Sequence, residues 1–211
     1  MGERVNPPTT TWGMETITTQ AQLDAAIAQG VSKMTITAQD RSSFILNPKQ
    51  PVEVTVTGRA SVYIFGNATV TAAEHCFVHA FDQVVVTARD EANVAVTDRS
   101  SVDARDQAVV EVAGQAQVTA RDQVRIDARD NSRVLANGVV HVEAKDDSVV
   151  AVCGAVRVVA TDRAQVMAMG RSSVLATRGV GIWATPGVEV KRKEVGDADS
   201  TLAGRTYSAV V

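Results

Sequence analysis

The chain has 211 residues, of which 45% are apolar but only 4% aromatic, and a formal net charge of −3. This composition argues against the thick, aromatic-rich core of an ordinary globular enzyme and against a basic nucleic-acid-binding surface. The chain also lacks an apolar run of the roughly 18–20 residues that a membrane-spanning helix needs, so we expect no membrane insertion.

The N-terminal segment, residues 1–33, is predicted to contain a short helix that begins near Thr18. Leu23, Ala26 and Ile27 would share one face of this helix, and Gly30 is a typical stop. Because the open end of a sheet exposes unpaired backbone groups, we expect the helix to cap the structure that follows.

Residues 34–195 form a repeat with a period of eight. From Val52 to Val195 the chain divides into eighteen octads without a gap, and position 3 of each octad is Val or Ile. Positions 1, 3 and 5 are small and mostly apolar, which predicts a short strand with one buried face. Position 7 is Asp eight times and Gly six times, which predicts a tight turn with left-handed backbone.

Two octads are predicted to make one coil of an all-β, parallel, two-sheeted β-solenoid of about ten coils. With this 16-residue period, Asp90, Asp106 and Asp122 align along one edge, and Phe65 lies over Phe81. An antiparallel meander would not explain why all the turns share one chemistry, and three octads per coil would scatter these runs. Residues 196–211 are expected to form an irregular C-terminal tail.

The octad V-x-A-x-D-x-A-x resembles the 16-residue β-solenoid repeats of bacterial ice-nucleation proteins. It is more similar to the V-x-A-x-[DG]-x-[AS] repeat proteins of bacteria and bacteriophages. The resemblance implies a β-solenoid and a bacterial or phage origin, but it implies no activity. Together with the absence of an apolar signal region at the start, it favours a cytoplasmic or virion-associated protein.

The candidate chemical sites are weak. Stacked Asp turns could hold Ca²⁺, but Arg89, Arg105 and Arg121 lie beside them in sequence and are expected to relieve their repulsion. Cys76 is assigned inward, His79 outward and His75 to a turn, so these residues should not form a zinc site. We expect no catalytic, cofactor-binding or metal-binding residues, and no cofactor.

Two outward apolar groups are the candidate interaction surface. The first lies near the N-terminal end of one sheet, and the second forms a row on the other sheet. Their members are Tyr63, Phe65, Phe77 and Phe81 in the first group, and Leu135, Met167, Met169 and Trp183 in the second. Apolar surface usually marks a contact, which would be either with the chain's own ends or with a partner.

Three functions are compatible with this pattern. The first is a non-enzymatic structural or protein-interaction solenoid that docks a protein partner or self-associates. The second is a module that binds an extended ligand, a glycan or ice, on a flat face carrying Thr55, Thr71, Thr87 and Thr119. The third, less favoured, is a carbohydrate-active enzyme with acids such as Asp103, Asp127 and Glu143.

Overall fold

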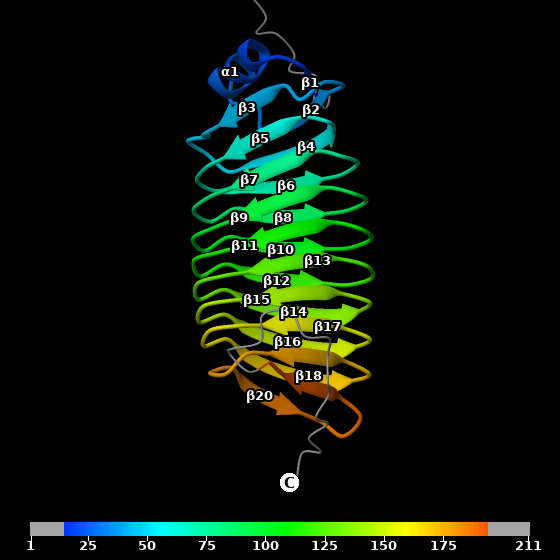
Figure 1. Ribbon diagram of the computed structural model, residues 1–211. Coiled ribbons are helices and arrows are strands. Elements are labelled where there is room, and N and C mark those ends of the chain that lie inside the picture. Colours follow the sequence, from blue (N-terminus) through cyan, green and yellow to red (C-terminus); the bar gives the residue numbers. More distant parts are fainter. Residues whose placement is uncertain (1–14, 194–211) are drawn as a thin grey trace, which may run out of the picture.

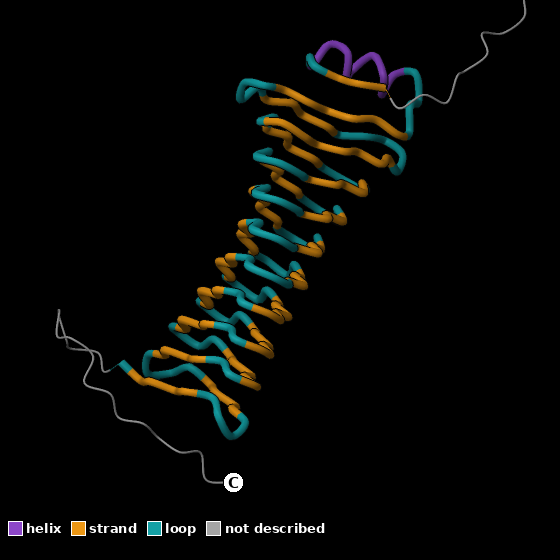
Figure 2. The backbone as a smooth tube through the Cα atoms, turned by 90° about the vertical axis from the view of Figure 1, so that its right-hand side faces the viewer, coloured by secondary structure: helices purple, strands orange, loops and turns teal. Residues whose placement is uncertain are grey.

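The computed structural model describes residues 15–193 and shows an all-β, parallel, two-sheeted solenoid of about eleven turns with one short helix. Figures 1 and 2 show the coils stacked along one axis, with the helix at one end. Every described strand pair is parallel, and from β2 onward successive strands alternate between the two sheets. The predicted fold class is confirmed.

Sheet A has eleven strands, of which all but the first carry even numbers. They are β1 (Glu15–Ile17), β2 (Lys33–Ala38), β4 (Val52–Gly58), β6 (Ala68–Ala72), β8 (Val85–Ala88), β10 (Ser101–Ala104), β12 (Gln117–Ala120), β14 (Arg133–Gly138), β16 (Val149–Gly154), β18 (Gln165–Gly170) and β20 (Gly181–Ala184).

Sheet B has ten strands, all with odd numbers. They are β3 (Ser43–Leu46), β5 (Ser61–Ile64), β7 (Phe77–Ala80), β9 (Asn93–Val96), β11 (Val109–Val112), β13 (Arg125–Ala128), β15 (His141–Ala144), β17 (Arg157–Ala160), β19 (Ser173–Ala176) and β21 (Glu189–Arg192).

The strand register has the predicted period of sixteen residues. Val102 pairs with Val118, and Val110 pairs with Ile126. The rings of Phe65 and Phe81 stack with centroids 4.7 Å apart, which confirms that they are neighbours in successive layers. Each octad position therefore forms a straight column of residues along the solenoid, as a parallel in-register sheet requires.

The core is a thin seam between the two sheets. Positions 1, 3 and 5 of the octads are buried throughout most of the array, and nearly all of them are Val, Ala or Ile. Alternating inward and outward residues follow from the period-2 geometry of a strand. Small side chains fill this interior over most of its length, and larger buried ones such as Phe44 and Leu46 lie near its N-terminal end.

The turns have the predicted left-handed backbone. All eight Asp residues at position 7 have positive φ, from 54° at Asp90 to 63° at Asp122, and so do the glycines at this position. A Cβ atom on Gly58 would lie 2.3 Å from the carbonyl oxygen of Ala38, so that turn accepts only glycine.

The helix α1 (Gln20–Ala28) covers the N-terminal end of sheet B, and β1 extends sheet A beyond β2. Thr19 is the N-cap and forms a capping box with Gln22, while Leu23 and Ala26 are buried. The predicted capping helix is therefore present. The pairing of β1 with β2 adds the turn that sequence periodicity did not predict.

The side chain of Gln20 completes this cap. Its Oε1 accepts a hydrogen bond from the Ile45 N–H at 2.9 Å, and its Nε2 donates to the Ile45 carbonyl at 3.1 Å. Ile45 lies in β3, the edge strand of sheet B. The amide of Gln20 thus replaces the backbone of a missing neighbouring strand.

At the other end, the seam is less closed among the described residues. Ile182, Val188 and Val190 are only partly buried, and Arg192 occupies an inward octad position. The guanidinium of Arg192 donates to the carbonyl of Val180 at 3.4 Å. Its charge ends the apolar seam, as the sequence indicated.

Candidate interaction faces

The C-terminal half of sheet A presents an outward surface almost without charge. Among the outward residues of β14, β16, β18 and β20, only Arg133 is charged. We call this surface the uncharged face. Its other members are Leu135, Asn137, Val149, Ala151, Cys153, Gln165, Met167, Met169, Gly181 and Trp183.

The register joins the large apolar side chains of this face into one row. Leu135 pairs with Ala151, Ala151 with Met167, and Met167 with Trp183. Leu135 is 56% exposed, Met167 42% and Trp183 76%. The predicted row of Leu135, Met167 and Trp183, with Met169 beside it, is therefore on one sheet and open on its outer side.

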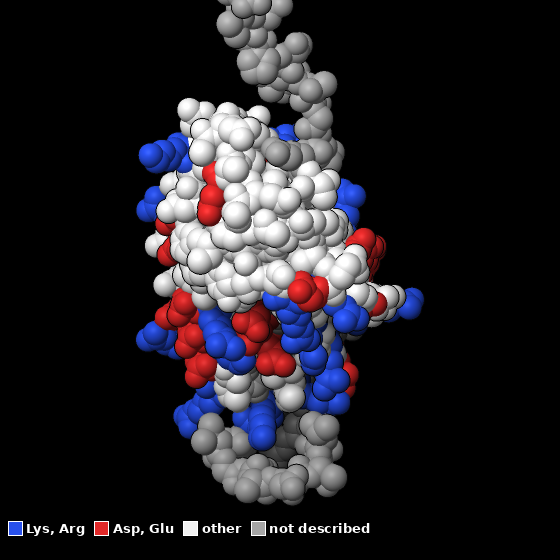
Figure 3. All heavy atoms as spheres, turned by 90° about the horizontal axis from the view of Figure 1, so that it is seen from above, with Lys and Arg blue, Asp and Glu red and all other residues white. Residues whose placement is uncertain are grey.

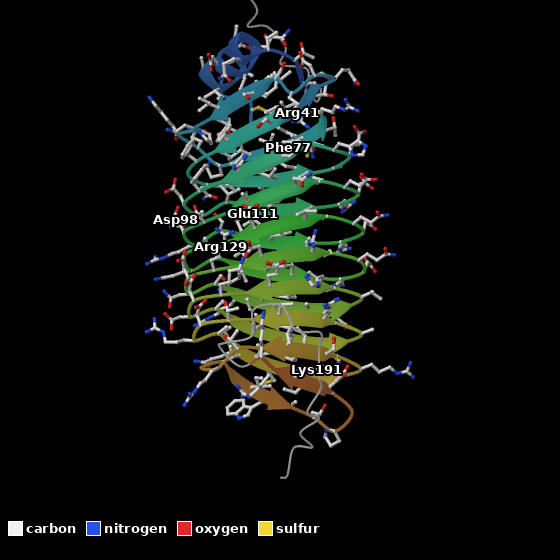
Figure 4. All side chains as sticks on the ribbon, viewed as in Figure 1. Arg41, Phe77, Asp98, Glu111, Arg129 and Lys191 are labelled. Atoms are coloured by element: carbon white, nitrogen blue, oxygen red, sulfur yellow. The ribbon has the colours of Figure 1, made fainter. Side chains whose placement is uncertain are left out.

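The coils at the N-terminal edge of this face carry a charged surface on sheet B, at β13 and β15. Asp127 lies 2.6 Å from Arg129 and 3.1 Å from Lys145, and Lys145 also contacts Glu143 at 3.3 Å. Figure 4 shows Glu111 and Arg129 on this face. One layer of coils therefore has two outer faces of opposite character.

The carboxyl group of Asp127 on sheet B is held in its ionised form. Burial alone would raise the pKa of Asp127, but hydrogen bonds from Arg129 and Lys145 outweigh it, and the pKa lies below the ordinary value. On sheet A, Asp103 is paired with Arg105 at 2.6 Å. A glycosidase general acid needs a raised pKa, so this arrangement does not favour acid catalysis at Asp127.

The first predicted group, with Tyr63, Phe65, Phe77 and Phe81, lies on sheet B near its N-terminal end. Tyr63 stacks on His79 with centroids 4.6 Å apart and an interplanar angle of 7°, and Phe65 stacks in the same way on Phe81. Arg41 lies 5.5 Å from the ring centre of Phe77, and both residues are labelled in Figure 4. Each stacked pair uses one face of each of its two rings.

Outward threonines form a ladder on the N-terminal half of sheet A. The paired residues in successive strands are Thr16, Thr35, Thr55, Thr71 and Thr87. Asp103 follows Thr87 in this column, and Thr119 comes next. The ladder is thus continuous over five strands and is then interrupted by a carboxylate.

The Asp turns satisfy backbone groups along the solenoid axis. The Asp130 carboxylate accepts from the Gly114 N–H at 2.9 Å, and the Asp146 carboxylate accepts from the Asp130 N–H at 3.2 Å. Arg105 binds Asp103 rather than Asp106, and no position-7 Asp forms an ion pair with another described residue. The direct partner of these carboxylates is thus a backbone N–H of the adjacent coil. The neighbouring arginines act at a distance: the hydrogen bond and ion pair with Asp103 raise the pKa of Arg105 most, and the charges of Asp122 and Asp106 also raise it.

The cluster around Cys76 is dispersed, as its register predicted. Cys76 is fully buried, His79 stacks on Tyr63, and His75 lies 3.2 Å from Glu91 at a turn. Burial raises the pKa of the Cys76 thiol to about 11. Within residues 15–193, no three His, Cys, Asp or Glu side chains are arranged to hold a metal ion.

Further surface features were not foreseen from the sequence. Ile45 is 60% exposed beside Tyr63, and Val139 is exposed at a turn. The low charge of the whole uncharged face was also missed, although the outward positions of the octads 132–139, 148–155, 164–171 and 180–187 lack acidic residues. Reading the columns for charge, rather than for large apolar residues alone, would have revealed it.

Two expectations concern residues outside the described part of the chain. One is that the N-terminal segment with Trp12 covers the aromatic group, and the other is that Leu202, Tyr207, Val210 and Val211 cover the row on sheet A. The end of the molecule formed by α1 is itself largely uncharged, and charged side chains surround it (Figure 3). Among the described helices, none is long and apolar enough to cross a membrane.

Comparison of this chain with protein-family models, with curated proteins and with solved structures finds no match.

Proposed function

We propose that the protein is a non-enzymatic interaction scaffold that docks a protein partner through the uncharged face of sheet A. The observation that carries this proposal is the contrast between this face and the charged surface that β13 and β15 present on the other sheet. Leu135, Met167 and Trp183 stand outward on one side, while Asp127, Glu143 and Lys145 form ion pairs on the other. Exposed apolar surface of this kind marks a contact site.

The column that carries these apolar side chains also accepts polar residues. Threonine occupies the same column in the N-terminal half of the sheet, so a polar, β-branched residue suits the position. Replacing threonine by Leu, Met and Trp adds nothing to the buried seam, which lies on the opposite side of each strand. The apolar side chains therefore serve a contact outside the described solenoid.

A role in a bacterial or phage assembly, in the cytoplasm or on a virion, follows from the octad resemblance and is part of this proposal. A rigid rod of about 50 Å, estimated from the 4.8 Å strand spacing, would present the docking face at a fixed distance from the capped end.

The test distinguishes side chains that dock a partner from side chains that stabilise the fold. We expect the triple variant Leu135→Thr, Met167→Thr, Trp183→Thr to keep the wild-type circular dichroism spectrum and its melting temperature within about 3 °C, because exposed sites contribute little to stability. Val134→Thr on the same strand is the matched control. It buries a hydroxyl in the seam and should lower stability by about 1–3 kcal/mol.

A marked loss of stability in the triple variant would overturn the proposal, since it would show that these side chains pack within the chain itself. An unchanged melting temperature supports docking, and the Val134→Thr control shows that the measurement detects a lost contact.

The threonine ladder favours a second candidate function, binding of a repetitive polar ligand such as a glycan or ice. Its support is the unbroken register of Thr16, Thr35, Thr55, Thr71 and Thr87 at the strand spacing. Thermal-hysteresis and glycan-array measurements test it, and negative results in both would exclude it.

A further inference from the structure

We infer that the partner of the uncharged face is a second copy of this chain, bound by a two-fold axis that runs parallel to the strands between β16 and β18. This inference rests on the proposed function and names its partner. In such a dimer the two solenoids lie antiparallel, with four coils of each in contact.

Charge is the first argument for a second copy. A surface with almost no charge is best matched by another uncharged surface, because a charged partner would lose hydration without gaining an ion pair. The outward residues of β11, β13 and β15 include charged ones such as Glu111, Arg125 and Glu143. The outward residues of β3, β5, β7 and β9 on sheet B are also uncharged, but there the aromatic rings stack on one another and on Arg41. The uncharged face of sheet A is therefore the uncharged surface whose large apolar side chains have no aromatic or cationic stacking partner among the described residues.

Size complementarity selects the axis. Rotation about a line between β16 and β18 exchanges β14 with β20 and β16 with β18, and it keeps each outward column in place. Ala151 then faces Met167 of the second copy, and Leu135 faces Trp183. A small residue meets a long one at the centre, and each contact occurs twice, as a two-fold interface requires.

The single charge of the face fits the same axis. Arg133 would face Gly181 of the second copy, where the absence of a side chain leaves room for the arginine stem and no like charge lies opposite. A Cβ atom at Gly181 would have its nearest neighbour, Gln165 Cγ, at 3.8 Å, so this position is open.

An axis parallel to the solenoid would give a poorer fit. It would place Ala151 against Ala151 and Trp183 against Trp183 of the second copy, leaving a gap at one layer and a crowded contact at the other. Packed interfaces avoid both, since their complementarity matches that of protein interiors.

The contact area determines the strength of the dimer. Four strands at 4.8 Å and five residues at 3.3 Å span about 19 by 16 Å, or roughly 300 Å² per copy. Stable interfaces bury about 800 Å² per partner, so this dimer is weak and depends on protein concentration. Trp183, the most exposed large side chain, contributes most, because tryptophan dominates binding energies at interfaces.

The first experiment measures self-association of the full chain by sedimentation equilibrium over a wide concentration range. We expect a reversible monomer–dimer equilibrium for the wild type. Met167→Glu would place two carboxylates beside the axis and weaken the dimer at least tenfold. Ile45→Glu, which changes a more exposed apolar residue on sheet B, should leave the dimer unchanged.

The second experiment tests the axis with a thiol-specific crosslinker of about 10 Å span, the distance between packed sheets. In a Cys153→Ser background, Arg133→Cys and Gly181→Cys are prepared as separate variants. We expect crosslinks when the two variants are mixed and few when either is alone, because each residue faces the other across the axis.

A wild type that stays monomeric at every concentration, or crosslinks that form mainly within one variant, would overturn the inference. A monomeric wild type together with an unchanged melting temperature of the triple threonine variant would leave the docking proposal standing with another partner. A destabilised triple threonine variant would overturn both the dimer inference and the docking proposal.

Discussion

At octad position 7, a single residue meets two demands. The backbone there has positive φ, which costs most residues about 1–2 kcal/mol but suits Gly, Asn and Asp. The position also leaves a backbone N–H without a partner inside its own turn. Asp serves both needs, because its carboxylate accepts that N–H from the preceding coil, as Asp130 does for Gly114.

Substitutions at Asp130 should separate the two demands. We expect Asp130→Asn to stay within about 0.5 kcal/mol of the wild type, since asparagine tolerates this backbone and loses the repulsion of stacked carboxylates. Asp130→Gly should lose about 1 kcal/mol with the hydrogen bond, and Asp130→Ala about 2 kcal/mol or more. Urea unfolding midpoints check the order. An alanine variant as stable as the glycine variant would show that backbone strain is unimportant here.

Cys76 provides a pH-dependent prediction. Its ordinary pKa of 9.0 is raised by burial to about 11 in the folded chain. Between these values the unfolded thiol loses its proton while the folded thiol keeps it, so the unfolded state binds fewer protons and stability falls as pH rises. Below pH 9 the thiol is neutral in both states and adds no pH dependence.

We expect the wild type to lose roughly 2–3 kcal/mol more than Cys76→Ala between pH 9 and 11. Alanine is a suitable control because Ala60 and Ala92 fill the same column in the neighbouring coils. Denaturant unfolding of both proteins across this range is the measurement. Parallel pH profiles would contradict a raised pKa for this thiol.

Among the elements, α1 shows how far local sequence signals reach. The Thr19 cap, the buried Leu23 and the stop near Gly30 are local features, and the predicted helix agrees with the structure. The role of Gln20 depends on Ile45, twenty-five residues away, and no local pattern contains that contact. The three-residue strand β1 was missed for the same reason, since its pairing with β2 is tertiary.

Loss of the Gln20 amide should affect association more than folding. We expect Gln20→Ala to cost about 1 kcal/mol or less in unfolding, because the contact is exposed, and to increase slow end-on aggregation, because β3 then presents unpaired backbone groups. Light scattering over time measures this. Gln20→Glu is a matched variant that keeps the acceptor and loses the donor. We expect it to aggregate faster than the wild type and more slowly than Gln20→Ala.

For the whole molecule, the 16-residue period explains why the architecture could be predicted from sequence. Every octad repeats the same inward residues, so one register accounts for the seam, the turns and the columns at once. The choice of ion-pair partners was less predictable. Arg105 forms an ion pair with Asp103 and not with the adjacent Asp106. This choice depends on side-chain geometry and not on spacing in the sequence.

The candidate interaction face also combines features that the sequence predicts with features that it does not. The sequence places Leu135, Met167 and Trp183 in one column, and the structure agrees. Their exposure could not be derived from the column alone, because the surroundings of an outward residue depend on what lies over the sheet. Likewise, the stacking of Tyr63 on His79 specifies which part of each ring is free, and periodicity carries no such information.

The period of the register also limits how the gene for this protein can change in length. Duplication or loss of a complete coil would leave every column aligned and both ends intact, so lineages can lengthen or shorten the rod with little penalty. A duplication of one octad would instead rotate everything beyond it by half a turn. The row that contains Trp183 would then lie on the opposite side of the solenoid from the threonines. We therefore expect changes in the length of this protein to occur in steps of one complete coil.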